Sequence, residues 1–177
     1  MTTWVALFRG INVGGKNLLP MQDLRDILSS LGCENVQTYI QSGNAVFSAA
    51  AGAGALSTQI KDAIEKRFGF APQVLLLTAE RLKAIVAANP FPDAEKTPKF
   101  LHVAFLTEAP ADPDLDALSD LKAPSEQFLL FDGAFYLHAP DGIGRSRLAA
   151  KVERCLGVAT TARNWRTVTK LLGLIGR

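Results

Sequence analysis

The segment Arg9–Asn17, with the sequence RGINVGGKN, has the residue types that bind phosphate groups. Gly10, Gly15 and Lys16 match the first seven positions of the phosphate-binding pattern G-x-x-x-x-G-K-[ST]. In loops of this type, backbone N–H groups surround the phosphates, the lysine neutralises their charge, and the final hydroxyl coordinates magnesium. Asn17 stands where that hydroxyl residue is expected. The segment is therefore a candidate site for a phosphorylated ligand.

The residues that follow argue against a nucleotide-hydrolysing site. In a loop of that kind a helix begins at once, so that the helix N-terminus faces the phosphates. Here Pro20 places the predicted start of the helix several residues beyond Lys16. Asn17 also lacks the hydroxyl group that would hold magnesium. We therefore expect a loop that does not hydrolyse nucleotides.

The composition of the loop still favours the binding of an anion. It combines three glycines, two cations and two asparagines: Gly10, Gly14, Gly15, Arg9, Lys16, Asn12 and Asn17. Glycines permit unusual dihedral angles and a close approach of the backbone to a ligand. The cations and the side-chain amides would supply donors. The alternative is a loop that only joins a strand to a helix, with both asparagines bonding the backbone.

The elements around this loop predict a ferredoxin-like half. The expected elements are a strand at 3–9, a helix after Pro20, two strands around the hairpin Ser42-Gly43-Asn44, a helix capped by Ser57 and ending at Gly69, and a strand at 71–78. The alanine- and glycine-rich segment 49–55 is expected to be a flexible surface loop. The order strand, helix, strand, strand, helix, strand is typical of the ferredoxin-like arrangement.

The same order repeats in the second part of the chain. The expected elements are a strand at 99–106, a helix at 113–121, a hairpin about Asp132-Gly133, a helix at 145–157, a strand at 158–163 and a last helix from Trp165. Aligning Gly69 with Gly157 also places Glu65 opposite Glu153. The predicted fold class is α+β, with two ferredoxin-like βαββαβ halves from an internal duplication plus a C-terminal helix.

This architecture divides the chain into three parts. Residues 1–80 form the half with the glycine-rich loop, residues 81–98 form a linker helix and a proline-rich turn, and residues 99–177 form the second half with a basic C-terminal helix. The 177 residues contain no apolar run near the ~18 residues that cross a bilayer. Cys33 and Cys155 show no disulfide pattern. We predict a cytoplasmic protein without a membrane segment.

Charge is distributed unevenly along the second half. Residues 108–141 contain eight acids and one base, whereas residues 142–177 contain eight bases and one acid. A basic C-terminal third could attract phosphates or an acidic partner. It could equally face the acidic segment within the fold or across a homodimer interface.

Two longer motifs resemble a known bacterial family. They are LFRGINVGGKNLLPMQDLRDILSSLGCENVQTYIQSGNAVF at the front and TARNWRTVTKL at the back, and they are similar to the signature of domain of unknown function 1697. The resemblance implies a two-part α+β protein related to the ferredoxin-like arrangement, and it implies no activity. It directs attention to polar residues that packing alone does not demand.

The candidate ligand-binding residues come from both motifs. They are Arg9, Gly10, Asn12, Gly14, Gly15, Lys16, Asn17, Ser42, Asn44, Arg163, Asn164 and Lys170. Asn164 can also cap the last helix, and Trp165 is expected in the core. Within one ferredoxin-like half, we expect the loop after the first strand and the Ser42-Gly43-Asn44 hairpin at opposite ends of the sheet. They would then meet only across the two halves or across a dimer.

Binding of an anionic or phosphorylated small ligand through Arg9–Asn17 is the function that the sequence favours. An RNA-binding module is an alternative, because this sheet is an RNA-recognition scaffold and Trp4, Phe8 and Phe47 could stack with bases. An enzyme acting on a phosphorylated substrate is a second alternative. The histidines, His102 and His138, lie in predicted strands away from a nucleophile. We therefore predict no catalytic residues, no metal site and no cofactor.

Overall fold

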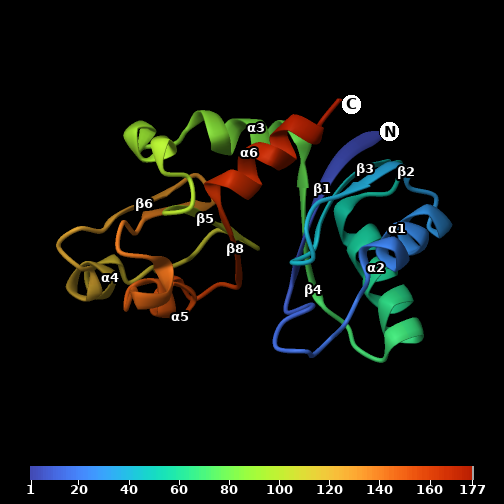
Figure 1. The fold of residues 1–177 in the computed structure, drawn as a ribbon, viewed down its shortest axis with the longest axis horizontal. Helices are drawn as coiled ribbons and strands as arrows, with labels where there is room; N and C mark the ends of the chain where they lie inside the picture. Colours follow the sequence, from blue (N-terminus) through green and yellow to red (C-terminus); the bar gives the residue numbers. More distant parts are fainter. Residues whose placement is uncertain (177) are drawn as a thin grey trace. The chain divides into compact units, whose positions relative to one another are not determined.

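The computed structural model describes residues 1–176 and divides into two compact units (Figure 1). Unit 1 contains residues 1–84 together with the C-terminal residues from Lys170, and unit 2 contains Ile85–Thr169. The change from unit 1 to unit 2 after Ala84 falls inside helix α3 (Ala79–Ala87). Within residues 1–176, no helix is both long enough and apolar enough to cross a membrane.

Unit 1 is a four-stranded antiparallel sheet with two helices on one face. Its elements are β1 (Thr2–Arg9), α1 (Met21–Ser30), β2 (Glu34–Thr38), β3 (Asn44–Ala49), α2 (Ala53–Phe68) and β4 (Gln73–Thr78). The strand order is β2-β3-β1-β4. Alternate residues of β1, such as Ala6 and Phe8, pack with Leu24 of α1 and Ile60 of α2. The period of two along the strand therefore directs one face of the sheet to the helices.

Unit 2 repeats this arrangement. Its elements are β5 (Leu101–Leu106), α4 (Leu115–Leu121), β6 (Gln127–Phe131), β7 (Ala134–His138), α5 (Val152–Leu156) and β8 (Thr160–Asn164). The strand order is β6-β7-β5-β8, and α4 and α5 cover one face (Figure 1). Along the chain, α3 and the 3-10 helix η1 (Pro92–Lys96) connect β4 to β5, and α6 (Trp165–Leu174) follows β8. Two ferredoxin-like halves and a C-terminal helix confirm the predicted fold class.

The predicted alignment of the halves is also confirmed. The N–H of Gly69 donates to the carbonyl of Glu65 at 2.8 Å, and the N–H of Gly157 donates to the carbonyl of Glu153 at 2.9 Å. Both glycines therefore end their helices in the same way. The Asp132-Gly133 hairpin lies between β6 and β7, as the sequence predicts.

Three local predictions were wrong. The loop expected at 49–55 is confined to residues 50–52, because Ala49 ends β3 and α2 begins at Ala53, four residues before the expected cap Ser57. Asn44 is the first residue of β3 and not part of the turn. Of the expected helix at 145–157, only α5 (Val152–Leu156) is α-helical, and the short 3-10 helices η2 (Ile143–Arg145) and η3 (Ala149–Lys151) precede it. Ser146 interrupts this segment with an extended backbone.

Candidate functional site

The loop that leaves β1 folds into a small hairpin of its own. The N–H of Lys16 donates to the carbonyl of Val13 at 3.0 Å, and the N–H of Asn12 donates to the carbonyl of Asn17 at 3.1 Å. Gly14 and Gly15, at the tip, have φ angles of 58° and 72°. This left-handed region favours glycine, because a Cβ there meets the following carbonyl. The tip is exposed to solvent.

The two asparagines hold this hairpin from inside. The Asn12 side chain donates to the carbonyls of Leu19 at 2.9 Å and Gln41 at 2.7 Å, and it accepts from the Leu19 N–H at 2.8 Å. The Asn17 side chain donates to the carbonyl of Gly10 at 3.0 Å. Both amide hydrogens of Asn12 are thus used within the protein. The interpretation in which the asparagines bond the backbone is confirmed for these contacts.

The loop and the β2–β3 hairpin lie at the same end of the unit 1 sheet, so the expected separation was wrong. β1 and β3 are antiparallel, with Leu7 opposite Asn44, and the N–H of Phe8 donates to the carbonyl of Gly43 at 2.9 Å. The end of one antiparallel strand always adjoins the start of its partner. A Cβ on Gly43 would lie 2.6 Å from the Ile11 Cδ1, so the two segments require glycine at their contact.

The polar residues of the β2–β3 hairpin differ in accessibility. Asn44 is fully buried, and its side chain donates to the Tyr39 carbonyl at 2.9 Å and to the Ser42 Oγ at 3.3 Å. Ser42 itself is exposed in the turn. Asn44 therefore supports the turn, and Ser42 is the hairpin residue that a ligand can reach.

The loops at this end of unit 1 carry positive charge only. Segments 9–20, 39–43 and 69–73 contain Arg9 and Lys16 and no acid, and we call them together the basic end. The guanidinium of Arg9 donates to the Gln73 Oε1 at 3.4 Å. The Lys16 side chain is exposed and makes no ion pair or hydrogen bond within residues 1–176. The ammonium of Lys170 lies 5.9 Å from the ring centroid of Tyr39, which adds a third cation nearby.

The back motif is divided between the two units. Asn164 accepts from the Thr167 N–H at 3.0 Å, which confirms the predicted cap, and Trp165 is buried as predicted. Arg163 donates to the carbonyl of Ala162 at 2.9 Å. Burial lowers the pKa of Arg163 to about 10, so its guanidinium stays charged at neutral pH. These residues belong to unit 2, whereas Lys170 belongs to unit 1.

The aromatic residues of the RNA-binding alternative are core residues. Trp4, Phe8 and Phe47 are at most 8% exposed and belong to the hydrophobic core of unit 1. They therefore offer no surface on which bases could stack. Among residues 1–176, no group of three or more His, Cys, Asp or Glu side chains could hold a metal ion.

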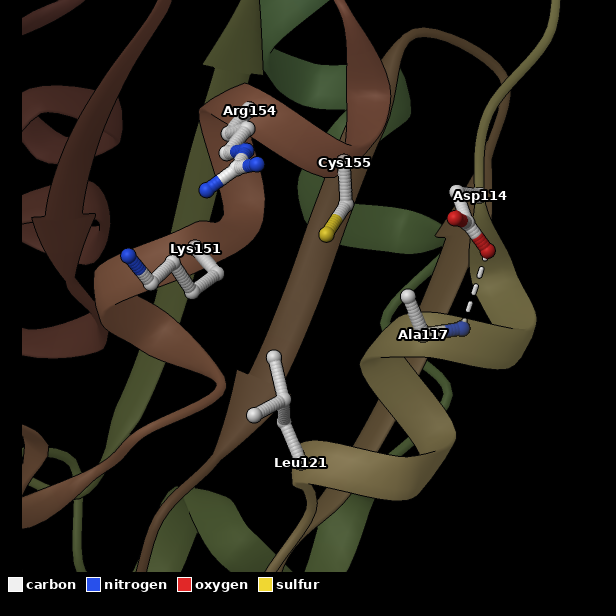
Figure 2. A pocket seen from close by; sticks show the side chains of 6 residues that line it. All are labelled: Asp114, Ala117, Leu121, Lys151, Arg154 and Cys155. Carbon is white, nitrogen blue, oxygen red and sulfur yellow. Dashed lines mark hydrogen bonds between the residues drawn. The ribbon is translucent and has the colours of Figure 1, made fainter.

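Unit 2 contains a cavity that the sequence did not reveal. Figure 2 shows it between α4 and α5, with a volume of about 280 Å³. Its lining residues are Asp114, Ala117, Leu121, Lys151, Arg154 and Cys155. The thiol of Cys155 points into it, while the Asp114 carboxylate accepts from the Ala117 N–H at 2.9 Å and caps α4 (Figure 2). The cluster of bases in 142–177 was the only sequence signal for this cavity.

Comparison with known proteins supports the resemblance that the motifs indicate. A model of the family described as protein of unknown function DUF1697 matches residues 1–136. The chain belongs to the DUF1697 family. The match includes the whole basic end, from the loop to residue 73. A comparison with curated proteins found no match.

A solved structure described as the conserved bacterial protein SP0830 from Streptococcus pneumoniae is similar over nearly the whole length. Its TM-score is 0.76 with 25% sequence identity, and the similarity covers 98% of each chain. Neither the family nor this bacterial protein is described with an activity. The function of this DUF1697 chain therefore has to be argued from its own residues.

Proposed function

We propose that the protein binds a small anion, most simply a phosphorylated compound, at the basic end of unit 1. The observation that carries the proposal is the exposed Gly14–Gly15 tip beside Lys16. Within residues 1–176 the backbone N–H groups of both glycines have no hydrogen-bond partner. Backbone N–H groups and a lysine are the donors that phosphate-binding loops use.

The loop is organised before any ligand arrives. Asn12 connects the loop to Leu19 and to the hairpin residue Gln41, and Asn17 closes it onto Gly10. A binding loop held in one conformation loses less conformational entropy when the ligand binds. In this proposal the asparagines are scaffold residues, whereas Lys16, the glycine N–H groups and Arg9 face the anion.

The charge of the site favours phosphate over neutral ligands. The basic end has two cations and no acid in its connecting segments. Asp23, in the first turn of α1 that follows the loop, is paired with Arg67, so its charge is offset by a cation. Positive charge raises the local concentration of anions and speeds their association. A hydrogen bond between a cation and a phosphate oxygen is also about twice as strong as one between neutral groups. Among residues 1–176, Lys16 has no partner to give up on binding.

A thermal-shift series tests the proposal. The melting temperature Tm of the wild type is measured with inorganic phosphate, pyrophosphate and nucleoside monophosphates, each against sodium chloride at equal ionic strength. Binding at a concentration of one hundred times Kd stabilises the folded state by about 2.7 kcal/mol, which gives a readable rise in Tm. Lys16→Ala should lose that rise.

The matched control is Lys83→Ala. Lys83 is also an exposed lysine of unit 1, but it lies on α3 and outside the basic end. It should keep the ligand-induced rise in Tm. The proposal is wrong if no anion raises the Tm of the wild type, or if Lys16→Ala and Lys83→Ala respond alike.

A further inference from the structure

The end of unit 2 that corresponds to the basic end has the opposite charge. The N–H of Leu106 donates to the carbonyl of Gly133 at 3.3 Å, as that of Phe8 does to Gly43. The N–H of Thr107 donates to the carbonyl of Ala159 at 3.1 Å. Segments 107–114, 131–133 and 157–159 therefore lie at one end of the unit 2 sheet, and we call them together the acidic end.

The segments of the acidic end contain acids and no base, and the bases Lys151 and Arg154 line the neighbouring cavity together with Asp114. The charged residues of the acidic end are Glu108, Asp112, Asp114 and Asp132. Asp114 caps α4, and the side chains of Glu108 and Asp112 are exposed. The internal duplication has thus produced two similar surfaces of opposite sign.

Both ends also expose large apolar side chains. Val13, Leu18 and Ile40 are 66%, 59% and 48% exposed at the basic end. Leu115, which directly follows the acidic end, is 38% exposed, and Phe131 within it is 52% exposed. These five are the majority of the eight large apolar side chains exposed in residues 1–176. Apolar side chains surrounded by charges are typical of protein–protein interfaces.

We propose that the acidic end of one copy of the chain docks on the basic end of a second copy. The inference rests on the proposed function, because it makes the carboxylates of a second copy an anionic partner of the same site. Glu108 and Asp112 would then face Arg9 and Lys16, while the exposed apolar side chains leave water together. The chain itself carries the complementary surface, which identifies a second copy as the partner.

Both surfaces are held in shape by hydrogen bonds within their own unit. Asn12 and Asn17 fix the basic end, and Thr107, bonded to Ala159 through both its N–H and its hydroxyl, fixes the acidic end. Docking of two organised surfaces requires little ordering of the chain. Because the two surfaces differ, a docked pair still has one basic end and one acidic end free for further contacts. Such contacts produce closed rings or growing chains.

Sedimentation velocity at low and high salt tests the inference. Raising the salt from about 0.01 M to about 1 M shortens the Debye length from roughly 30 to 3 Å and screens exposed charge pairs. The wild type should form species above the monomer mass at low salt, increasingly with protein concentration, and these should dissociate at high salt. A wild type that stays monomeric at low salt would overturn the inference.

Charge reversal identifies the surfaces. Lys16→Glu alone and Glu108→Lys/Asp112→Lys together should each be monomeric at low salt. Mixing these two variants should restore association, because the intact acidic end of Lys16→Glu and the intact basic end of Glu108→Lys/Asp112→Lys can form the wild-type contact. Lys83→Glu, which changes the same charge outside both ends, should associate like the wild type. Association that persists in either reversed variant, or no recovery in the mixture, would contradict the assignment of the surfaces.

The same variants separate this inference from the proposed function. Glu108→Lys/Asp112→Lys leaves the basic end intact, so it should keep the rise in Tm with phosphate while it loses self-association. A wild type that responds to phosphate but never self-associates would overturn only the inference. A wild type that shows neither response would overturn both.

Discussion

The two equivalent ends of the duplicated fold have the same strand arrangement, but their connections are stabilised differently. In unit 2, β6 and β7 are joined by the two-residue turn Asp132-Gly133 and β7 starts with Ala134. In unit 1 the connection Tyr39–Gly43 has five residues and β3 starts with the buried amide of Asn44. The β2–β3 connection is therefore supported by a buried polar side chain, whereas the β6–β7 connection needs only local turn geometry.

A second pair of equivalent positions, inside the two sheets, also differs between the units. Leu7 and Phe105 pair with the first residues of β3 and β7, so Trp4 and His102, three residues earlier, are equivalent. The Trp4 Nε1 and the His102 Nδ1 are both buried without a hydrogen-bond partner within residues 1–176. Indole does not titrate, but imidazole does. Only unit 2 therefore gains a pH dependence from this position.

The largest expected effect is a difference in unfolding free energy between glycine substitutions in the two turns. Gly43→Ala should lower the free energy of unfolding by about 3 kcal/mol, because its Cβ would meet Ile11 and Phe8 at 2.6 and 2.7 Å and its φ is 89°. Gly133→Ala, strained by a φ of 73°, should lose only about 1 kcal/mol. Urea denaturation of both variants measures the difference. Equal losses of unfolding free energy would show that the contact between loop and hairpin adds no cost beyond the strain of a positive φ.

A smaller effect should distinguish the scaffolds of the two ends. Asn12→Gly keeps the φ of 53° accessible and removes three hydrogen bonds, so it should cost about 2 kcal/mol and weaken the phosphate response. Asp114→Ala removes one helix cap and should cost about 1 kcal/mol. Chemical denaturation gives both values, and thermal shift gives the phosphate response. Retention of the full phosphate response in Asn12→Gly would mean that the loop does not need this scaffold.

The smallest expected effect is the pH dependence from His102. Burial lowers the pKa of this side chain in the folded state, against a weaker opposing effect of the Phe100 backbone. As pH falls below about 6.5, the unfolded chain takes up a proton that the folded chain does not, so stability is lost. His102→Phe should remove that part of the decline, measured by urea denaturation between pH 8 and pH 5. Trp4→Phe is the control, and it should leave the pH profile unchanged. If His102→Phe leaves the pH profile of stability unchanged, His102 is not the cause of the loss of stability at low pH.

The sequence alone determined the order of elements, the family and one of the turns. Asp132-Gly133 between two apolar runs specifies a hairpin by local backbone preference, and Gly69 and Gly157 end their helices for the same local reason. Segment 49–55 was mispredicted because its many alanines and glycines carry no periodic pattern, although α2 starts there at Ala53.

Only the tertiary structure decided which polar residues are used in hydrogen bonds within the protein. Asn12 looked like a donor for an anion, yet its partners Leu19 and Gln41 lie 7 and 29 residues along the chain and use its amide completely. That contact exists because β1 pairs antiparallel with β3, which brings the loop to the hairpin. Local sequence determines backbone preference, but a side chain's hydrogen-bond partners depend on which distant segments the packed sheet brings beside it.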